Sequence, residues 1–285
     1  LAVIATTLFC LFLAAIFAFP FMLAAFLPST SIPLMLGLPA IWVISEWVRS
    51  WIFTGFPWLY AGYSHTETWL NGWAPIGGVL SLSFFSALTA MLFLWLVQGM
   101  EQRRSTLSLS VILMVLTISG YLLQQVNWTK DIGKPLTVAL IQPNIAQNEK
   151  WSVEKRRTIL TQLAAQTEAY WGHDIIIWPE AAVPSTPKRI PVFMQNLERK
   201  ANDSGSTLLT GIITQDGEQG RYYNSVLAVG DQSGQYHKTR LVPFGEYVPL
   251  ESLLRGLIQF FDLPMSSLSV GPSNQIPLTV QKQLI

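Results

Sequence analysis

The sequence predicts two domains, a multi-span α-helical membrane domain followed by an α/β layered domain. Half of the residues are hydrophobic and only 12% are charged, against roughly 25% charged residues in an average soluble domain. Of the 18 basic and 17 acidic side chains, six lie in residues 1–128 and the others in residues 129–285. Long apolar runs fill the first part, whereas short strand-like and helix-like patterns alternate in the second. We therefore expect the first part in a lipid bilayer and the second part in water.

Four apolar stretches in the first part are long enough to cross a bilayer, which takes roughly 20 helical residues. They cover about residues 1–27, 33–53, 76–98 and 106–125. The first stretch has neither a basic start nor a small-residue cleavage site, so it is predicted as a span and not as a signal peptide. Pro20 is acceptable inside it as a kink.

The short link between the third and fourth stretches sets the predicted orientation. It carries Arg103 and Arg104, and basic links tend to stay on the cytoplasmic side of a membrane. The fourth span would then deliver residues 129–285 to the outer side.

Two charges sit unexpectedly at the end of the second stretch. Glu46 and Arg49 are three residues apart, so they share a helical face and can form an ion pair. Charged side chains within a span usually face protein or water. Two interpretations stay open: a satisfied ion pair beside a belt of interfacial aromatic residues, or the wall of a cavity that admits a lipid. The aromatic residues of this segment are Trp47, Trp51, Trp58 and Tyr60.

The second part reads as strand–helix–strand–helix–strand followed by further strands, which argues for an α/β layered domain. A buried strand is expected to end at Pro143, and a helix over 149–171 turns Trp151, Ile159, Leu163 and Ala164 toward one face. The other expected elements are strands at 175–178, 206–214, 221–230 and 234–242, and a helix at about 190–203. The sequence shows no metal-ligand spacing and no glycine-rich phosphate loop, so no metal and no cofactor is predicted. A net charge of +1 gives no reason to expect nucleic acid as a partner.

Two residues of this domain are candidates for chemistry, because active sites of such sheets lie just beyond the carboxyl ends of strands. Glu180 follows the strand "IIIWP", and Lys238 follows a later strand in "YHKTRLVPFGEYVPL". Taken singly, a carboxylate such as Glu180 is more often a helix cap or a solvated charge, and a lysine such as Lys238 is usually a surface residue.

Together, the motifs resemble those of the nitrilase, or carbon–nitrogen hydrolase, superfamily. "WPE" at 178–180 resembles its glutamate motif, and "HKTRLVPFGEYVP" at 237–249 resembles its lysine motif. The spans with "EWVRSWIFTGFPW" at 46–58 and "QPNIAQNEKW" at 142–151 are similar to its membrane branch, the apolipoprotein N-acyltransferase family. "PFGEYVPLESLLR" and "FFDLPMSSLSVGP" add to this similarity, which extends over essentially the whole chain. The resemblance implies that the α/β domain is a nitrilase-like layered sandwich.

The resemblance also implies a Glu–Lys–Cys triad. Glu180 would be the general base, and Lys238 would stabilise the oxyanion that forms during acyl transfer. Glu246 would orient Lys238 or the acceptor amine, as the family's second glutamate does, and Trp151 matches a tryptophan of the active-site region.

The third member of the triad is absent from the sequence. Both ends of the chain look cut, and the family's cysteine follows a strand for which "IPLTVQKQLI" resembles the lead-in. Cys10 lies in the first apolar stretch and cannot replace it. We therefore expect a cysteine shortly after Ile285 in the parent protein, and we expect the chain as given to be inactive.

The activity implied is transfer of a fatty acyl chain from a phospholipid to the N-terminal cysteine amine of a diacylglyceryl apolipoprotein, through a thioester on the enzyme. The implied location is the bacterial inner membrane, crossed several times, with the catalytic domain on the periplasmic side. A membrane-tethered amidase is an alternative, since water would then replace the amine. A transporter with an extracytoplasmic binding domain is a further alternative from a different class.

An acyl chain leaving the bilayer needs an apolar path, because each exposed methylene costs roughly 0.8 kcal/mol. The segment 54–64, interrupted by Gly55 and Pro57, is predicted to supply this path through Phe56, Trp58 and Tyr60. It is expected at the outer membrane surface, where tryptophan and tyrosine are favoured, facing Glu180 and Lys238. Those two residues are expected to converge with little solvent around them, beneath a mobile apolar flap formed by residues 241–250.

Overall fold

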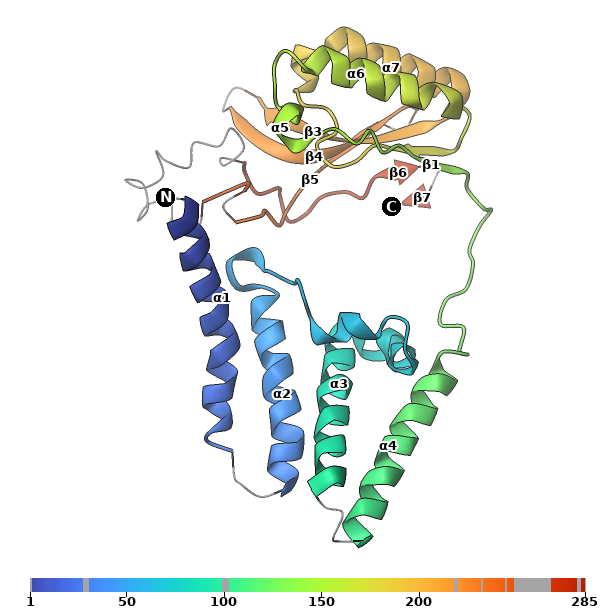
Figure 1. Cartoon of the computed structure of the whole chain (residues 1–285). Helices are drawn as coiled ribbons and strands as arrows, with labels where there is room; N and C mark the ends of the chain where they lie inside the picture. Colours follow the sequence, from blue (N-terminus) through green and yellow to red (C-terminus); the bar gives the residue numbers. More distant parts are fainter. Residues whose placement is uncertain are drawn as a thin grey trace. The chain divides into compact units, whose positions relative to one another are not determined.

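The structure is a computed structural model that divides into two compact units, residues 1–132 and 133–285, four residues after the predicted boundary (Figure 1). The described residues are 2–27, 31–98, 103–217, 220–231, 233–243, 245–248, 268–280 and 283–284. Most of "PFGEYVPLESLLR" and much of "FFDLPMSSLSVGP" lie outside them.

The first unit contains four long helices at the four predicted stretches (Figure 1). These are α1 (Ala2–Ala24), α2 (Ser31–Arg49), α3 (Ala74–Gln98) and α4 (Arg103–Leu123). The short turns η1 (Ile52–Thr54), η2 (Ala61–His65) and η3 (Trp69–Trp73) connect α2 to α3. The second helix stops four residues earlier than expected, since 50–53 belong to turns.

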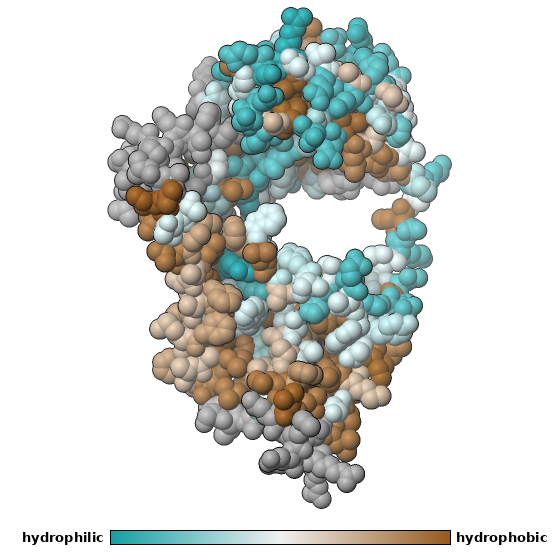
Figure 2. Space-filling view, viewed as in Figure 1, coloured by the Kyte–Doolittle hydropathy of each residue, from teal (hydrophilic) through white to brown (hydrophobic). Residues whose placement is uncertain are grey.

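Two segments in the described part of this unit are long and apolar enough to cross a membrane, Thr6–Ala24 and Trp69–Val97. Leu107–Leu123 is a shorter apolar helix. Apolar side chains cover much of the visible face of these helices (Figure 2). The helices themselves are thus confirmed, while four membrane spans stay a proposal.

The second unit is built on one five-stranded mixed sheet in the order β1-β2-β3-β4-β5. The first three strands are parallel, and the last two continue the sheet antiparallel. Their bounds are β1 (Val138–Leu140), β2 (Ile175–Ile177), β3 (Thr207–Asp216), β4 (Arg221–Val229) and β5 (Gly234–His237). The crossover helices α6 (Arg156–Thr167) and α7 (Pro191–Ser204) lie on the same face of this sheet (Figure 1).

Alternating residues of the strands serve two cores because successive side chains point to opposite faces. Ile176 and Leu208 belong to the cluster beneath the helices, whereas their neighbours Ile175 and Leu209 pack with Val280 on the opposite face. Val280 ends β6 (Thr279–Val280), which forms a small separate hairpin with β7 (Gln283–Leu284). The segment 276–285, which is expected to lead into a further strand, contains this hairpin.

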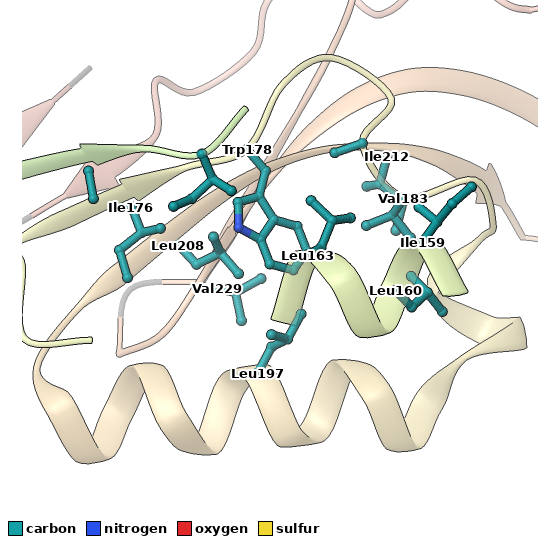
Figure 3. Close-up of a cluster of buried hydrophobic side chains, with 13 residues drawn as sticks. Ile159, Leu160, Leu163, Ile176, Trp178, Val183, Leu197, Leu208, Ile212 and Val229 are labelled. Atoms are coloured by element: carbon teal, nitrogen blue, oxygen red, sulfur yellow. The ribbon is translucent and has the colours of Figure 1, made fainter. Parts of the chain in front are cut away.

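The helix-side core surrounds Leu163 of α6 and the indole of Trp178 (Figure 3). Leu163 and Ile176 are fully buried, and Trp178 Nε1 donates a hydrogen bond of 2.9 Å to the buried Thr167 hydroxyl. The indole nitrogen is thereby satisfied inside an apolar core, as buried polar groups require. This packing fixes the chain immediately before Glu180.

Two expectations for local structure are wrong. The first strand is not buried throughout, because β1 is at the end of the sheet order and both Val138 and Leu140 are exposed. The helix predicted over 149–171 is broken into α5 (Gln147–Lys150), α6 and the turn η4 (Glu168–Tyr170). Trp151 caps α5 outside any helix, while Ile159 and Leu163 do face the core as expected.

Leu163→Ala should destabilise the second unit by about 3 kcal/mol, because it leaves a cavity in a packed core. The matched control is Leu140→Ala, which removes the same atoms from an exposed strand position and should change stability by less than about 0.5 kcal/mol. Hydrogen exchange of β2 and β3 amides measures both values. Equal effects of the two substitutions would contradict the assignment of this core.

Candidate active site

Glu180 is delivered by the end of β2. The Trp178 amide donates to the Leu209 carbonyl of β3 at 2.8 Å, which extends the parallel pairing one residue past the strand. Pro179 then ends the pairing because it has no amide hydrogen. The chain turns sharply at this point, and Glu180 projects from the carboxyl edge of the sheet.

Lys238 is delivered by β5, which pairs with β4 in a register that aligns His237 with Ser225. The Lys238 amide donates to the Asn224 carbonyl at 2.8 Å, one residue beyond the strand. Beneath it, His237 Nδ1 and the Ser225 hydroxyl lie 2.8 Å apart, so the strand end is fixed by a part-buried polar contact. Burial lowers the pKa of His237, opposed by the Asp216 charge.

The two predicted residues converge although they lie 58 residues apart, which confirms that expectation. Lys238 Nζ donates to Glu180 Oε1 at 2.8 Å and lies 3.0 Å from Glu246 Oε2. Lys238 Nζ also donates to Glu246 Oε1 at 3.1 Å, so the ammonium contacts both oxygens of that carboxylate. One cation thus bridges two carboxylates, and the expected proximity of Glu246 is confirmed as well.

Asn224 is a site residue that the sequence patterns did not identify. Its Nδ2 donates to Glu180 Oε1 at 2.6 Å and to Glu246 Oε1 at 2.7 Å. It is buried in the middle of the sheet, where the only sequence signal is a polar amide inside the apolar strand "YYNSVLAVG". The Glu180 and Glu246 carboxylates can lie close together because Lys238 and Asn224 both donate hydrogen bonds to them.

The three charged side chains differ in exposure: 64% for Glu180, 29% for Lys238 and 11% for Glu246. The expectation of little solvent around the pair is therefore wrong for Glu180, because its turn projects beyond the packed core. Glu246 is held inside by the Val242 amide, which donates to its Oε2 at 2.7 Å. The segment around 241–248 is thus tied to the site, and Phe244, Pro249 and Leu250 of the predicted flap lie outside the described residues.

The electrostatics keep the pair ionised at neutral pH. Burial raises the pKa of Glu180, but hydrogen bonds and charge from Lys238, with help from Asn224, outweigh it, so the net pKa lies below the ordinary value. Burial lowers the pKa of Lys238, and the two carboxylates outweigh this, so its net pKa lies above the ordinary value. An ionised carboxylate that a reactant can reach is suited to accept a proton.

A cleft of about 610 Å³ opens beside these residues. It is lined by Ile177, Trp178, Glu180, Leu209, Gly211, Asn224, Ser225, Val226, Tyr236, Lys238, Thr239 and Arg240. Trp151 does not line it; the indole packs against the cluster of Ile213, Leu241 and Leu268. In the part of the chain that the structure describes, no group of three or more His, Cys, Asp or Glu is placed to hold a metal ion.

The predicted ion pair of the helical unit is wrong. Glu46 is 3% exposed, and its Oε1 accepts from Trp42 Nε1 at 2.9 Å and from the Ala61 amide at 2.8 Å. Arg49, the last residue of α2, lies over the Tyr60 ring at 5.1 Å and contacts the Leu59 carbonyl. The Ala61 amide reaches Glu46 Oε1 because the loop after η1 folds back against α2, while Glu46 Oε2 is buried without a hydrogen-bond partner among the described residues.

The three residues predicted to line a lipid path differ in their surroundings. Trp58 is 67% exposed, whereas Tyr60 is 5% exposed and stacks on Tyr63. The Phe56 ring packs edge-on against Phe9 of α1. Tyr60 is therefore an interior residue and not part of an open surface, and Trp58 is the accessible aromatic residue of the three.

The mixed sheet, the helices on one face and the Glu–Lys pair at the strand ends define the carbon–nitrogen hydrolase class. The sequence model of that family, described as carbon-nitrogen hydrolase, matches residues 137–279, and the chain belongs to this family. Residues 1–92 match the apolipoprotein N-acyltransferase N-terminal domain. The chain is thus a relative of the apolipoprotein N-acyltransferases, as the motifs predicted.

Curated relatives of that name agree with both matches. The protein of Pseudomonas syringae pv. tomato is 41% identical over 96% of this chain and 56% of its own length. The proteins of Vibrio parahaemolyticus and Coxiella burnetii are 39% and 35% identical over 83% and 99% of this chain, and 48% and 58% of their own lengths. The chain spans about half the length of the curated relatives it matches. A solved N-terminal amidase is 22% identical over 38% of this chain and 28% of its own, with a TM-score of 0.26.

Asn224→Leu should raise the pKa of Glu180, because it removes a hydrogen bond that favours the charged carboxylate. The Glu180–Lys238 contribution to stability is present above the ordinary pKa of a glutamate and is lost as pH falls through the depressed folded value. In the variant, the contribution should be smaller and its loss should be complete at a higher pH. Carbon-13 NMR of labelled glutamate side chains, with Glu180→Gln as the assignment, measures the midpoint.

The matched control is Asn202→Leu, on the exposed side of α7, which should leave the Glu180 midpoint where it was. An unchanged midpoint in Asn224→Leu would contradict the role given to the amide.

Proposed function

We propose that the protein transfers a fatty acyl chain from a phospholipid to the N-terminal amine of a diacylglyceryl apolipoprotein. The single observation that carries this is the Lys238 ammonium between Glu180 and Glu246 at the edge of a cleft. The name of the curated relatives, apolipoprotein N-acyltransferase, supports acyl transfer to an apolipoprotein amine. Apolar helices in the same chain fit a donor that stays in a bilayer.

Each site residue has a role that follows from its surroundings. Glu180 is ionised and accessible, so it accepts the thiol proton and later returns it to the leaving group. Lys238 donates toward the oxyanion that forms on the acyl carbonyl. Glu246 is buried and bonded to a backbone amide, so it holds Lys238 in place and does not exchange protons with a substrate.

The nucleophile of this proposal is a cysteine in a part of the protein beyond this sequence, after Ile285. The one cysteine of the sequence, Cys10, is in α1 of the other unit. A thiolate there would attack the acyl ester and retain the acyl group as a thioester, while the lysophospholipid leaves with the returned proton. The amine of the acceptor then attacks the thioester and gives up a proton to Glu180, and the carbon–sulfur bond breaks to release the thiolate.

The helical unit would cross the bacterial inner membrane several times and carry the second unit on the periplasmic side. Trp58 would contact the donor near the headgroup level, with Phe56 in the same segment. A membrane-tethered amidase is the second candidate, because the exposure of Glu180 also admits water. A transport role gains no support from Glu46, which is buried and bonded within its own unit.

Lys238→Ala in the full-length protein should lower acyl transfer by at least about 10²–10³-fold, because it removes the donor to the oxyanion. Lys188→Ala is the matched control, since it removes an exposed lysine of the same unit. The assay follows acyl transfer from a labelled phospholipid in micelles to a diacylglyceryl peptide. Amide hydrogen exchange checks that both variants stay folded. Normal transfer by Lys238→Ala would overturn the proposed function, and hydrolysis without transfer by the unaltered protein would favour the amidase.

Trp58→Ala should raise the KM for the phospholipid donor by about 10-fold, because the loss of one buried aromatic contact costs about 1.4 kcal/mol. The rate of thiol alkylation should stay unchanged. Trp47→Ala, which removes an exposed tryptophan of α2, is the control for general anchoring at an interface. Equal KM changes in the two variants would assign Trp58 to anchoring alone. Donor titrations in bilayers of fixed composition provide the measurement.

A further inference from the structure

The turn that carries Glu180 has a strained backbone. Ala181, the next residue, has a φ of 46°, in the left-handed region that residues with a side chain seldom occupy. Such a conformation persists only where the surrounding structure holds it. The Ala182 amide closes the turn on the Pro179 carbonyl at 3.2 Å. The question is which groups keep Glu180 in this arrangement.

One support is the backbone of β3. A side chain at Gly211 would place its Cβ 2.5 Å from the Pro179 carbonyl oxygen and 2.5 Å from the Ala181 amide. Only glycine permits the turn to lie this close to the strand. The Val183 amide then rejoins the sheet by donating to the Gly211 carbonyl at 3.3 Å.

The other support is a charged side chain from a different element. Lys150, the last residue of α5, donates from Nζ to the Glu180 backbone carbonyl at 3.1 Å. Its ammonium also lies 6.0 Å from the Trp151 ring centroid. Within the described residues Lys150 forms no ion pair. Burial lowers its pKa, against an opposing effect of the Glu180 charge. A half-buried cation that donates to a backbone carbonyl is unlike a solvated surface lysine.

We propose that Lys150 is a positioning residue for Glu180: it holds the Glu180 carbonyl so that the carboxylate of the same residue meets Lys238. This role rests on the proposed acyl transfer, in which Glu180 is the base. The charged groups that face Glu180 are Lys238 after β5, Glu246 in the following loop and Lys150 from α5. Lys150 thereby connects the end of α5 to the turn that carries Glu180.

The test compares Lys150→Met with Lys150→Arg. Lys150→Met keeps the length of the side chain but removes the donor and the charge, so the Glu180 titration midpoint should shift upward and the backbone carbonyl shift of Glu180 should change. Lys150→Arg keeps the donor and the charge. Its Glu180 midpoint and carbonyl shift should therefore lie close to those of the unaltered protein. These are measured by carbon-13 NMR on the chain in detergent micelles, so they do not depend on catalysis.

Activity supplies the second readout in the full-length protein. For Lys150→Met, kcat/KM should fall by about 10- to 100-fold, the scale of a small misplacement of a catalytic group, and the acid limb of its pH profile should move upward. Lys188→Met, at an exposed position, should change neither readout. An unchanged Glu180 midpoint and carbonyl shift in Lys150→Met would overturn the proposal. Altered NMR signals together with no acyl transfer by the unaltered protein would uphold the positioning contact and reject the proposed function instead.

Discussion

The site depends on one interaction, the Lys238 ammonium shared by Glu180 and Glu246. Two carboxylates this close would repel each other and take up a proton if they stood alone. The ammonium and the Asn224 amide remove that penalty and keep Glu180 below its ordinary pKa. The two carboxylates in turn hold the pKa of Lys238 above its ordinary value. Glu180 and Lys238 therefore both stay charged at neutral pH.

The sheet makes this interaction possible because it brings two distant strand ends to one place. The parallel strand β2 supplies Glu180, and the antiparallel strand β5 supplies Lys238 on the far side of β3 and β4. The space between them is set by small or polar residues of the intervening strands, Gly211 and Asn224. A bulkier residue at position 211 would push the Glu180 turn away from β3. The core packing around Trp178 then keeps the start of that turn rigid.

In the helical unit, one oxygen of the buried Glu46 carboxylate is held by hydrogen bonds and not by an ion pair with Arg49. Glu46 accepts two hydrogen bonds from its own helix and the following loop, so a carboxylate is held where apolar side chains predominate. Glycine residues allow the backbones of η3 and α4 to approach each other closely. A Cβ on Gly72 would lie 1.9 Å from the Gly120 carbonyl oxygen, so glycine is required for that approach. Close backbone packing of this kind is typical of helices in apolar surroundings.

The sequence by itself determined the two-unit organisation, the four apolar helices and the alternation of strands and helices, because hydrophobic periodicity and charge distribution are local properties. It also identified Glu180, Lys238 and Glu246 through motifs. Only the tertiary structure decided which groups contact them: Asn224 and Lys150 are ordinary polar residues in the sequence, and their positions follow from strand register and from the break between α5 and α6. The Glu46–Arg49 pairing failed for the same reason. Helical spacing states which side chains share a face, but the Ala61 amide that takes the Glu46 carboxylate comes from a loop whose path no local pattern specifies.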